Sequence, residues 1–437
     1  MDLKNKKVTV VGLGRSGFAA AKFLWEQKAD VRVTEAGDKP EILENAGYLR
    51  VLGVEVETGK HTEEFVSGSE WVVTSPGVPK NSLPLEWAKQ KKISVISEVE
   101  LASYFCQGRI VAVTGSNGKT TTCHLIYRVL VDAGLDCALC GNVGFSFLDA
   151  LSKVNPQTIV VLELSSFQLE DSPCLKPEIA VVLNVSPNHL DRHGTLENYA
   201  RAKENIFKNQ TAEDTLVLNR EDDRVKAMAK KARSRVVFFS ASDALEEWLS
   251  YPLKGKHNRS NLMACSAVAS LLGVSEDSMK KTWLNFKTLE HRIEVLGELN
   301  GVLFVNDSKS TTIESTRAAI LTMDRPVVLV AGGRDKGASF AEVESALLER
   351  AKRVVLYGEA REKIAASWKK FKNVRKENDF SAAVRLALRE AESGDCVLLS
   401  PMCTSFDQFS SFEQRGEKFK QLFETLGREA GVAECPR

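Results

Sequence analysis

The sequence predicts an α/β protein made of three successive α/β domains. We expect a Rossmann-like N-terminal domain, a central P-loop-type mononucleotide-binding domain and a Rossmann-like C-terminal domain. Short apolar runs alternate with helical patterns along the chain, as they do when helices cover a parallel sheet. The chain has 437 residues, which is more than one hydrophobic core usually serves. Two glycine-rich turns, each between a strand and a helix, indicate two sites for phosphorylated ligands.

Each expected domain has its own series of elements, and the domains are expected at residues 1–107, 108–296 and 297–437. The first has strands at 6–11, 31–34, 71–74 and 93–95, with a helix at 16–27. The second has strands at 110–114, 158–164, 179–185, 215–219 and 236–239, with a helix at 119–133. The third has strands at 302–306, 327–331, 353–357 and 396–400, with helices at 312–322, 340–351 and 382–392.

Composition excludes several classes of protein. The 59 basic and 58 acidic residues leave a net charge of +1, which provides no field that favours nucleic acid or an anionic membrane. The apolar runs are too short to span a bilayer, and the N-terminus passes from charged residues directly into a strand without a signal peptide. The nine cysteines are an odd number, and Cys137 and Cys140 have no second pair at zinc-finger spacing. We therefore expect a cytoplasmic protein with reduced thiols, neither nucleic-acid-binding nor membrane-bound.

The segment VAVTGSNGKTTT, residues 111–122, predicts a phosphate-binding loop. A strand runs into a glycine turn and then a helix, so backbone N–H groups and the helix dipole converge on one place. Lys119 would reach the β- and γ-phosphates, and the Thr120 hydroxyl suits Mg²⁺. Val113 stands where the general P-loop pattern has its first glycine.

A second phosphate loop, VTVVGLGRSG, has Gly12, Gly14 and Gly17 in a GxGxxG pattern. Glu35 ends the next expected strand, where a dinucleotide-binding domain keeps its ribose-binding acid, so this segment alone would predict a dehydrogenase. The same turn suits any pyrophosphate. Two such loops in one chain require two phosphorylated ligands.

Two side chains that could bind a metal ion or a substrate lie at or after the ends of strands of the central domain. Glu163 ends one expected strand and His189 comes shortly after the next, at the sheet edge where the Gly115–Lys119 loop is also expected. Both side chains suit contacts to Mg²⁺ or to a substrate. The alternative is that both have only structural roles, Glu163 as a hydrogen-bonded acid at the end of a strand and His189 as a loop residue. Zinc binding by His189 and His193 is disfavoured because Pro187 and Gly194 bracket a loop. A GTP switch is disfavoured because no NKxD motif is present.

In combination, these motifs resemble one family, the Mur ligases, which join amino acids to the peptidoglycan precursor with ATP. The resemblance rests on TGSNGKTT, NVSPNHLDRH, YARAK, GKHNRSN, EHRIE and NDSKST in this order, and it spans nearly the whole chain. The family's ATP loop is shorter than the general P-loop, which accounts for Val113. The segments GLGRSG, LELSSFQLE and SPMCTSFDQFSSFEQRG are similar to members that add D-glutamate to UDP-N-acetylmuramoyl-L-alanine.

The resemblance implies roles for residues around ATP and Mg²⁺. The implied ATP contacts are Gly115, Ser116, Asn117, Gly118, Lys119, Thr120, Thr121, Asn142, Asn258, Asn261, Arg292 and Asp307. The implied metal ligands are Thr120, Glu163, His189 and a carbamylated Lys203. The implied catalytic residues are Lys119, Glu163, His189, Lys203 and Lys309.

The resemblance also implies contacts to the other two substrates. Those to the UDP-linked substrate are Leu13, Gly14, Arg15, Ser16, Glu35, Ser75, Gly77, Asn142, Ser165, Gln168 and His189. Those to D-glutamate are Thr311, Lys336, Ser405 and Phe412, with Lys336 preferred over Arg334 for the side-chain carboxylate.

The expected activity is therefore an ATP-dependent ligation through an acyl phosphate, by a monomer with small-molecule substrates. The alternatives are another Mur-type ligase or a folylpolyglutamate synthetase, a dehydrogenase, and a nonenzymatic nucleotide-binding regulator. The presence of Lys119, Glu163, His189 and Lys203 argues against the last.

Overall fold

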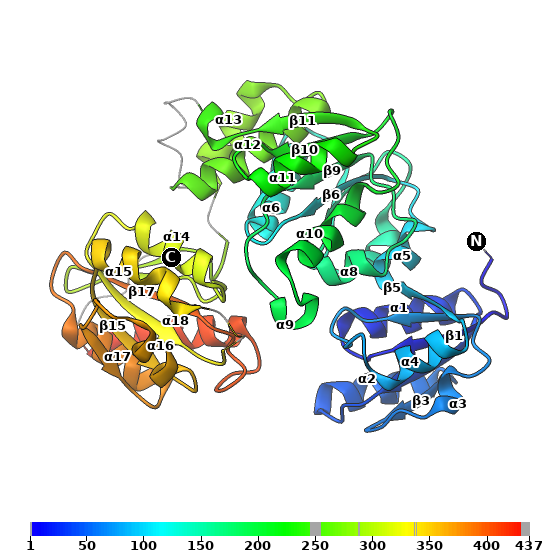
Figure 1. Ribbon diagram of the computed structural model, residues 1–437, viewed down its shortest axis with the longest axis horizontal. Helices are drawn as coiled ribbons and strands as arrows, with labels where there is room; N and C mark the ends of the chain where they lie inside the picture. Colours follow the sequence, from blue (N-terminus) through cyan, green and yellow to red (C-terminus); the bar gives the residue numbers. More distant parts are fainter. Residues whose placement is uncertain (1, 245–254, 287–288, 336, 338, 430–437) are drawn as a thin grey trace. The chain divides into compact units, whose positions relative to one another are not determined.

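The computed structural model describes residues 2–244, 255–286, 289–335, 337 and 339–429, and contains three sheets in chain order (Figure 1). The three successive α/β regions expected from the sequence are confirmed. By their contacts the residues form two compact units, and the first two sheets belong to one unit while the third belongs to the other.

The first sheet is parallel throughout and has the strand order of a Rossmann sheet, β3-β2-β1-β4-β5. Its region consists of β1 (Lys7–Val11), α1 (Arg15–Glu26), β2 (Asp30–Glu35), α2 (Pro40–Val51), β3 (Glu55–Thr58), α3 (Glu63–Val66), β4 (Trp71–Thr74), α4 (Leu83–Gln90), β5 (Ser94–Ser97) and α5 (Glu98–Ser103). The strand order reverses between β1 and β4, so the loops after these two strands border the expected ligand crevice.

The second sheet is also parallel, in the order β11-β10-β9-β6-β8-β7. Its region consists of β6 (Arg109–Thr114), α6 (Lys119–Asp132), β7 (Cys137–Gly141), α7 (Phe147–Ala150), β8 (Ile159–Glu163), α8 (Ser166–Glu170), β9 (Ile179–Val182), α9 (Leu190–His193), α10 (Leu196–Glu204), β10 (Thr215–Asn219), α11 (Asp223–Met228), β11 (Arg235–Phe239), α12 (Lys256–Leu271) and α13 (Glu276–Leu284). Because β6 lies between β8 and β9, the loops after these three strands meet at one sheet edge.

The third sheet has the order β12-β13-β17-β14-β15-β16, with β12 antiparallel and the others parallel. Its region consists of β12 (Glu294–Leu299), β13 (Val302–Asn306), α14 (Ile313–Thr322), β14 (Val327–Gly332), a 3-10 helix η6 (Phe340–Val343), α15 (Glu344–Arg350), β15 (Ala351–Tyr357), α16 (Arg361–Ser367), β16 (Val374–Lys376), α17 (Phe380–Glu390), β17 (Cys396–Met402) and α18 (Phe412–Glu429). The last strand enters between β13 and β14, so this sheet departs from the Rossmann order although helices cover both of its faces.

The strand β12 has no counterpart among the strands expected from the sequence. Asn300 and Gly301 have φ values of 52° and 77°, and they form the two-residue turn of a hairpin between β12 and β13. The expected boundary between residues 296 and 297 therefore falls inside a strand of the third sheet. The boundary expected between residues 107 and 108 lies just before β6.

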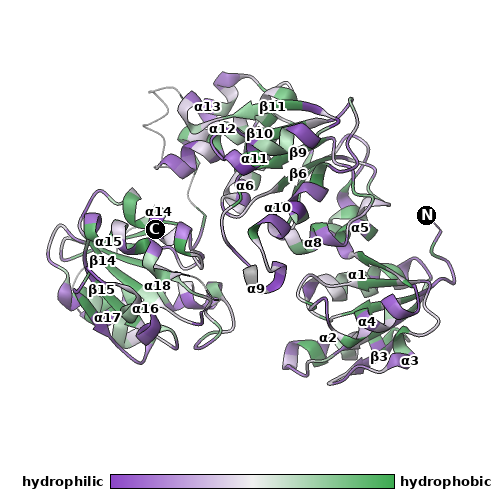
Figure 2. Cartoon of the chain, viewed as in Figure 1, coloured by the Kyte–Doolittle hydropathy of each residue, from purple (hydrophilic) through white to green (hydrophobic). Residues whose placement is uncertain are grey.

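Apolar side chains hold each sheet to its helices, and hydrophobic residues are concentrated along the strands (Figure 2). One buried cluster, which includes Val10, Leu24, Leu162 and Tyr199, spans the first two regions, so they share a core. In the third region, α14, α15 and α16 pack on one face of the sheet, and α17 and α18 pack on the other. No helix within the described ranges is both long and apolar enough to cross a membrane.

Candidate active site

The phosphate loop between β6 and α6 is held by asparagines from two other elements. Asn184, which follows β9, accepts a hydrogen bond from Asn117 N at 2.8 Å and donates one to Asn117 O at 3.0 Å. Gly118 has a φ of 83°, and a Cβ at this position would lie 2.4 Å from Oδ1 of Asn261 on α12. These contacts position the loop backbone before the N-terminus of α6, which attracts phosphate.

Two lysine side chains converge on the start of this loop. Lys119 Nζ donates to Gly115 O at 2.8 Å and to Ser116 O at 2.9 Å. Lys203 Nζ on α10 donates to the same Gly115 O at 2.9 Å and lies 4.3 Å from the ring centroid of Tyr199. These N–H donors beside the loop suit the phosphate chain of a nucleotide.

Lys203 is an unusual lysine because its side chain is 1% exposed. Burial, together with the charge of Lys119, lowers the pKa of Lys203 well below its usual value. A buried lysine of this kind is a neutral amine over a wider pH range and can act as a nucleophile. The sequence placed Lys203 on a helix but gave no sign of this burial.

Glu163 ends β8 beside the phosphate loop and is also 1% exposed. Its Oε1 accepts a hydrogen bond from Asn142 Nδ2 at 2.8 Å, and its backbone O accepts one from Asn142 N at 2.9 Å. Its Oε2 is buried and has no hydrogen-bond partner among the described residues. A carboxylate oxygen left without a protein partner fits a divalent cation, which prefers oxygen ligands.

The structure therefore brings most of the predicted ATP and metal residues of the first unit together at the carboxyl edge of the second sheet. Ser116, Thr120 and Thr121 are buried there, the last two in the first turn of α6. Asn261 is also buried, and its Oδ1 lies 3.3 Å from Thr122 Oγ1.

The GxGxxG loop of the first sheet is compact for steric reasons. A Cβ on Gly17 would lie 1.9 Å from Gly12 O, so α1 can approach β1 this closely only with glycine. Gly14 is the N-cap of α1, and Ser75, which follows β4, places its Oγ 3.4 Å from Gly12 O. The loops after β1 and β4 are thus in contact.

Glu35 and Leu13 take part in this loop differently from the expectation that they face the uridine. Leu13 is fully buried, so only its backbone is available to a ligand. Its N–H donates to Glu35 Oε2 at 2.7 Å, while Glu35 Oε1 accepts a hydrogen bond from Gly37 N at 2.7 Å. Glu35 therefore braces the loop.

Ser165 and Gln168 form a capping box at the start of α8. The Ser165 side chain accepts a hydrogen bond from Gln168 N, and Gln168 Oε1 accepts one from Ser165 N at 3.0 Å. Both side chains thus stabilise the start of α8, close after Glu163 at the end of β8.

The two histidines considered for zinc have separate environments. His189 has a φ of 54° and belongs to residues 186–191, which are grouped with the second unit. His193 is buried on α9, with Nε2 3.0 Å from Ser166 Oγ and Nδ1 3.4 Å from Glu170 Oε1. Neither histidine belongs to a group with metal-ligand geometry within the ranges that the structure describes.

In the second unit, Asp307 follows β13 and is buried. Its Oδ2 accepts a hydrogen bond from Ser400 Oγ at 2.8 Å, and its Oδ1 accepts one from Ile293 N at 3.3 Å. Burial raises the pKa of Asp307 to about 6, against the opposing effects of nearby hydroxyls and Arg292. Burial and the same Arg292 lower the pKa of His257 to about 4. Asn258, one residue further along α12, is buried.

The residues expected to hold D-glutamate lie at the carboxyl edge of the third sheet. Lys309 Nζ lies 5.1 Å from the ring centroid of Phe412, Ser405 is buried and Thr311 is half-buried. Lys336 lies outside the described residues.

Arg334, the alternative to Lys336 for the glutamate side chain, is already paired. Its Nη2 and Nε lie 2.9 Å and 3.0 Å from the two carboxylate oxygens of Glu359. This pairing disfavours Arg334 as the substrate ligand.

Arg415, on the first turn of α18, is a buried residue that was not among those expected from the sequence. Its guanidinium is fully buried and donates to Ser308 Oγ at 2.9 Å, to Ser308 O at 2.8 Å and to Cys403 O at 3.3 Å. It thereby joins the loops after β13 and β17. The only signal was an arginine at an inward position of an amphipathic helix.

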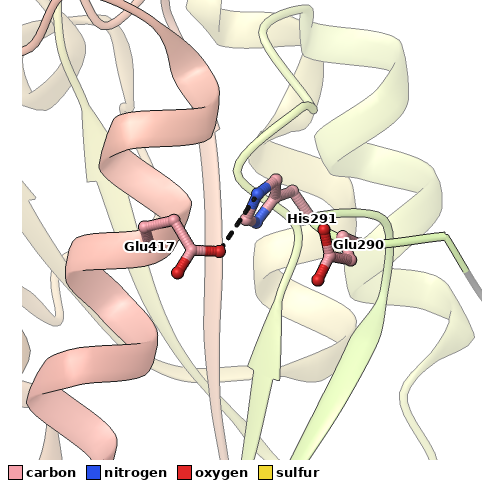
Figure 3. Close-up of side chains that lie close together, drawn as sticks. All are labelled: Glu290, His291 and Glu417. Carbon is pink, nitrogen blue, oxygen red and sulfur yellow. Dashed lines mark ion pairs between the residues drawn. The ribbon is translucent and has the colours of Figure 1, made fainter. Parts of the chain in front are cut away.

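One group in the second unit has the geometry of a metal site, formed by Glu290, His291 and Glu417 (Figure 3). His291 Nε2 lies 3.7 Å from Glu417 Oε1. Lys420 Nζ lies 3.0 Å from Glu290 and 3.1 Å from Glu417, and it also contacts Glu294 at 2.9 Å. Although burial opposes it, hydrogen bonding to these carboxylates raises the pKa of Lys420. The ammonium supplies the positive charge, so we interpret the group as an ion network.

Comparison with protein families gives three matches in the order of the three sheets. Residues 6–97 match the Mur ligase MurD-like N-terminal domain, residues 113–269 the Mur ligase middle domain and residues 291–403 the Mur ligase glutamate ligase domain.

Individual relatives extend over nearly the whole chain. The chain is 39% identical to the UDP-N-acetylmuramoylalanine–D-glutamate ligase of Koribacter versatilis, over 98% of this chain and 99% of the relative. It is 40% identical to the ligase of the same name from Pelotomaculum thermopropionicum, over 97% and 99%.

Solved structures share the fold at lower identity. The MurF ligase of Thermotoga maritima in complex with ADP has a TM-score of 0.62 at 19% identity, covering 98% of this chain and 99% of that one. The UDP-N-acetylmuramate-alanine ligase MurC of the same organism has a TM-score of 0.61 at 18% identity, covering 96% and 99%. The family expected from the motifs is confirmed: the chain belongs to the Mur ligases.

Proposed function

We propose that this chain is an ATP-dependent ligase that joins D-glutamate to UDP-N-acetylmuramoyl-L-alanine in peptidoglycan precursor synthesis. The main support is that relatives with this named activity are 39% and 40% identical over nearly their full length. The buried groups around the phosphate loop supply the chemistry that such a reaction needs.

ATP would bind with its phosphates over residues 115–121. Lys119 now rests on two loop carbonyls, and we expect its ammonium to exchange them for the β- and γ-phosphates. The further nucleotide contacts proposed are Asn142, Asn258, Asn261, Arg292 and Asp307.

Mg²⁺ fits the first unit because Glu163 Oε2 is buried without a protein partner among the described residues. Glu163, Thr120, His189 and a carbamylated Lys203 would hold the ion. When bound, it would offset negative charge on the phosphate oxygens.

The burial of Lys203 and its depressed pKa support carbamylation of this residue. The neutral amine nitrogen attacks the carbon of CO₂, a C–N bond forms as one C=O π bond breaks, and one proton leaves to solvent. The neutral amine thereby becomes an anionic carbamate with oxygen atoms that can bind a metal. The buried side chain of Lys203 would thereby carry the negative charge that favours binding of a divalent cation. We expect a carbamate resonance in ¹³C NMR with labelled CO₂ that is absent in Lys203→Ala.

The ligation has two chemical steps. The carboxylate of the substrate's L-alanine attacks the γ-phosphorus, and the bond to the β-phosphate oxygen breaks to release ADP. The amine of D-glutamate then attacks the acyl carbon, loses a proton and expels inorganic phosphate. Lys119 would neutralise charge that develops during phosphoryl transfer, with Lys309 near the transferring group.

The other substrates would bind at the carboxyl edges of the outer sheets. The UDP portion would contact the backbone of residues 13–16 and the turn at Ser75 and Gly77, with Glu35 bracing the loop. D-Glutamate would lie near Thr311, Lys336, Ser405 and Phe412. A lysine opposite its side-chain carboxylate suits a dianionic substrate.

Phosphate release is the decisive assay, with ATP, UDP-N-acetylmuramoyl-L-alanine and D-glutamate, L-glutamate, L-alanine or meso-diaminopimelate. We expect release that depends on both the UDP substrate and D-glutamate, and that disappears in Lys119→Ala. Activity with L-glutamate but not D-glutamate would overturn the assignment, as would NADH binding without ligation. We further propose that the protein acts in the cytoplasm as a monomer. Light scattering of the purified protein tests the monomeric state.

A further inference from the structure

We propose that Arg15 is a positioning residue that aligns the metal-binding carboxylate of Glu163 when the UDP substrate binds. This inference rests on the proposed function of the site. Arg15 stands in the GxGxxG loop, and the sequence alone suggested that it contacts the UDP portion directly. Its hydrogen bonds lead instead to the second region.

The Arg15 guanidinium joins the two ends of a short turn after β7. Its Nη1 donates to Gly144 O at 2.9 Å and its Nη2 to Gly141 O at 3.2 Å. The turn is closed by a hydrogen bond from Gly141 N to Phe145 O at 2.9 Å. Two separate guanidinium nitrogens hold the two carbonyls in a rigid planar fork, whereas a lysine would offer a single nitrogen on a flexible stem.

The same turn carries Asn142, which is bound to Glu163 through both its backbone and its side chain. Asn142 N donates to Glu163 O at 2.9 Å, and Asn142 Nδ2 donates to Glu163 Oε1 at 2.8 Å. A Cβ on Gly141 would lie 2.4 Å from Glu163 O, so the turn is pressed against the end of β8. Displacement of the turn would therefore move the carboxylate.

Arg15 is also the first residue of α1, within the loop expected to meet the UDP portion. A diphosphate bound to the backbone of residues 13–16 would immobilise the start of α1 and with it the guanidinium. The connection thus runs from Arg15 through Gly141 and Asn142 to Glu163. Because coupling between two ligands is reciprocal, a bound metal ion should also favour the UDP substrate.

The contacts favour this role over simple stabilisation. The Arg15 side chain is exposed, so its removal should cost little stability. Small displacements of a catalytic group, in contrast, have large effects on a reaction.

The test is Mn²⁺ binding, measured by electron paramagnetic resonance on the full chain with ADP, without turnover, with and without UDP-N-acetylmuramoyl-L-alanine. Arg15→Met should weaken Mn²⁺ binding about threefold to tenfold, the effect expected for lost hydrogen bonds, and should reduce the increase that the UDP substrate causes. Arg15→Lys should behave like Arg15→Met.

Arg32→Met is the matched control, because Arg32 lies on β2 of the same region and pairs with Glu55 at 3.0 Å. It should leave Mn²⁺ binding unchanged. A double-mutant cycle of Arg15→Met with Asn142→Ala should be non-additive, since both changes act through one turn.

Two results would overturn the proposal. Unchanged Mn²⁺ binding with weaker binding of the UDP substrate would make Arg15 a direct phosphate ligand, and unchanged binding of both would leave it without a role. If the wild-type protein binds Mn²⁺ but not the UDP substrate, the proposed function fails, while the effect of Arg15 on metal binding is still measured.

Discussion

Replacing Gly118 with alanine should weaken nucleotide binding far more than its effect on stability would suggest. Gly118 has a φ of 83°, in which an L-residue costs roughly 1–2 kcal/mol. The new Cβ would also lie 2.4 Å from Asn261 Oδ1, so the loop or Asn261 must move by about 1 Å to restore a normal contact. A shift of about 1 Å can reduce catalysis roughly 100-fold.

Gly134 offers a matched control, because it is a glycine of similar φ that lies just beyond the C-terminal end of α6. Its φ is 81°, and a Cβ there would meet no atom within 4 Å. Gly134→Ala should therefore carry the backbone cost alone, which corresponds to a fall in Tm of about 2–4 °C per kcal/mol in a domain of this size. The difference between the two variants isolates the collision with Asn261.

The assays are thermal unfolding and calorimetric titration with ADP. Gly118→Ala should bind ADP at least about tenfold more weakly, whereas Gly134→Ala should stay within about twofold of the wild type. Equal ADP affinities for the two variants would refute the argument that the close approach of Asn261 shapes the phosphate loop.

Three further predictions concern buried charged groups. Glu163→Gln should preserve the fold but weaken Mn²⁺ binding about tenfold or more, in the same resonance titration, because an anionic ligand is lost. Burial raises the pKa of Glu98 to about 7, so the stability that its protonated form contributes is lost as pH rises from about 4.5 through 7. In urea unfolding, the free energy of unfolding of the wild type should fall by roughly 3 kcal/mol at most between pH 5 and 8, and that of Glu98→Gln should not show this fall. A variant with the same pH profile as the wild type would contradict this. Arg415→Met should lower the unfolding free energy by about 2 kcal/mol, because the carbonyls of Ser308 and Cys403 lose a buried donor; a change below about 0.5 kcal/mol in urea unfolding would contradict this.

Much of the central site is predictable because its determinants are local. A strand, a glycine turn and a helix follow one another over residues 109–132, so the phosphate loop is encoded in consecutive residues. Glu163 is predictable for a related reason, since the end of a parallel strand lies at the same edge as the loop. The strands around β6 are equally visible as apolar runs.

Contacts between distant segments were not visible. The Asn300–Gly301 hairpin was not among the expected elements, and the insertion of β17 between β13 and β14 depends on pairing between residues about 70 and about 90 positions apart. Glu35 was expected at the uridine, yet its carboxylate braces Leu13 and Gly37. Such roles depend on which backbone donors the fold brings within reach.

The sequence by itself determined the family, the three α/β regions and the phosphate loops, because these depend on short-range order and on motif spacing. Only the tertiary structure decided that Lys203 is buried, that Arg415 is enclosed and that Arg15 reaches the turn beside Glu163. The physical reason is that burial and hydrogen-bond partners arise from segments far apart in the chain, which no local pattern records.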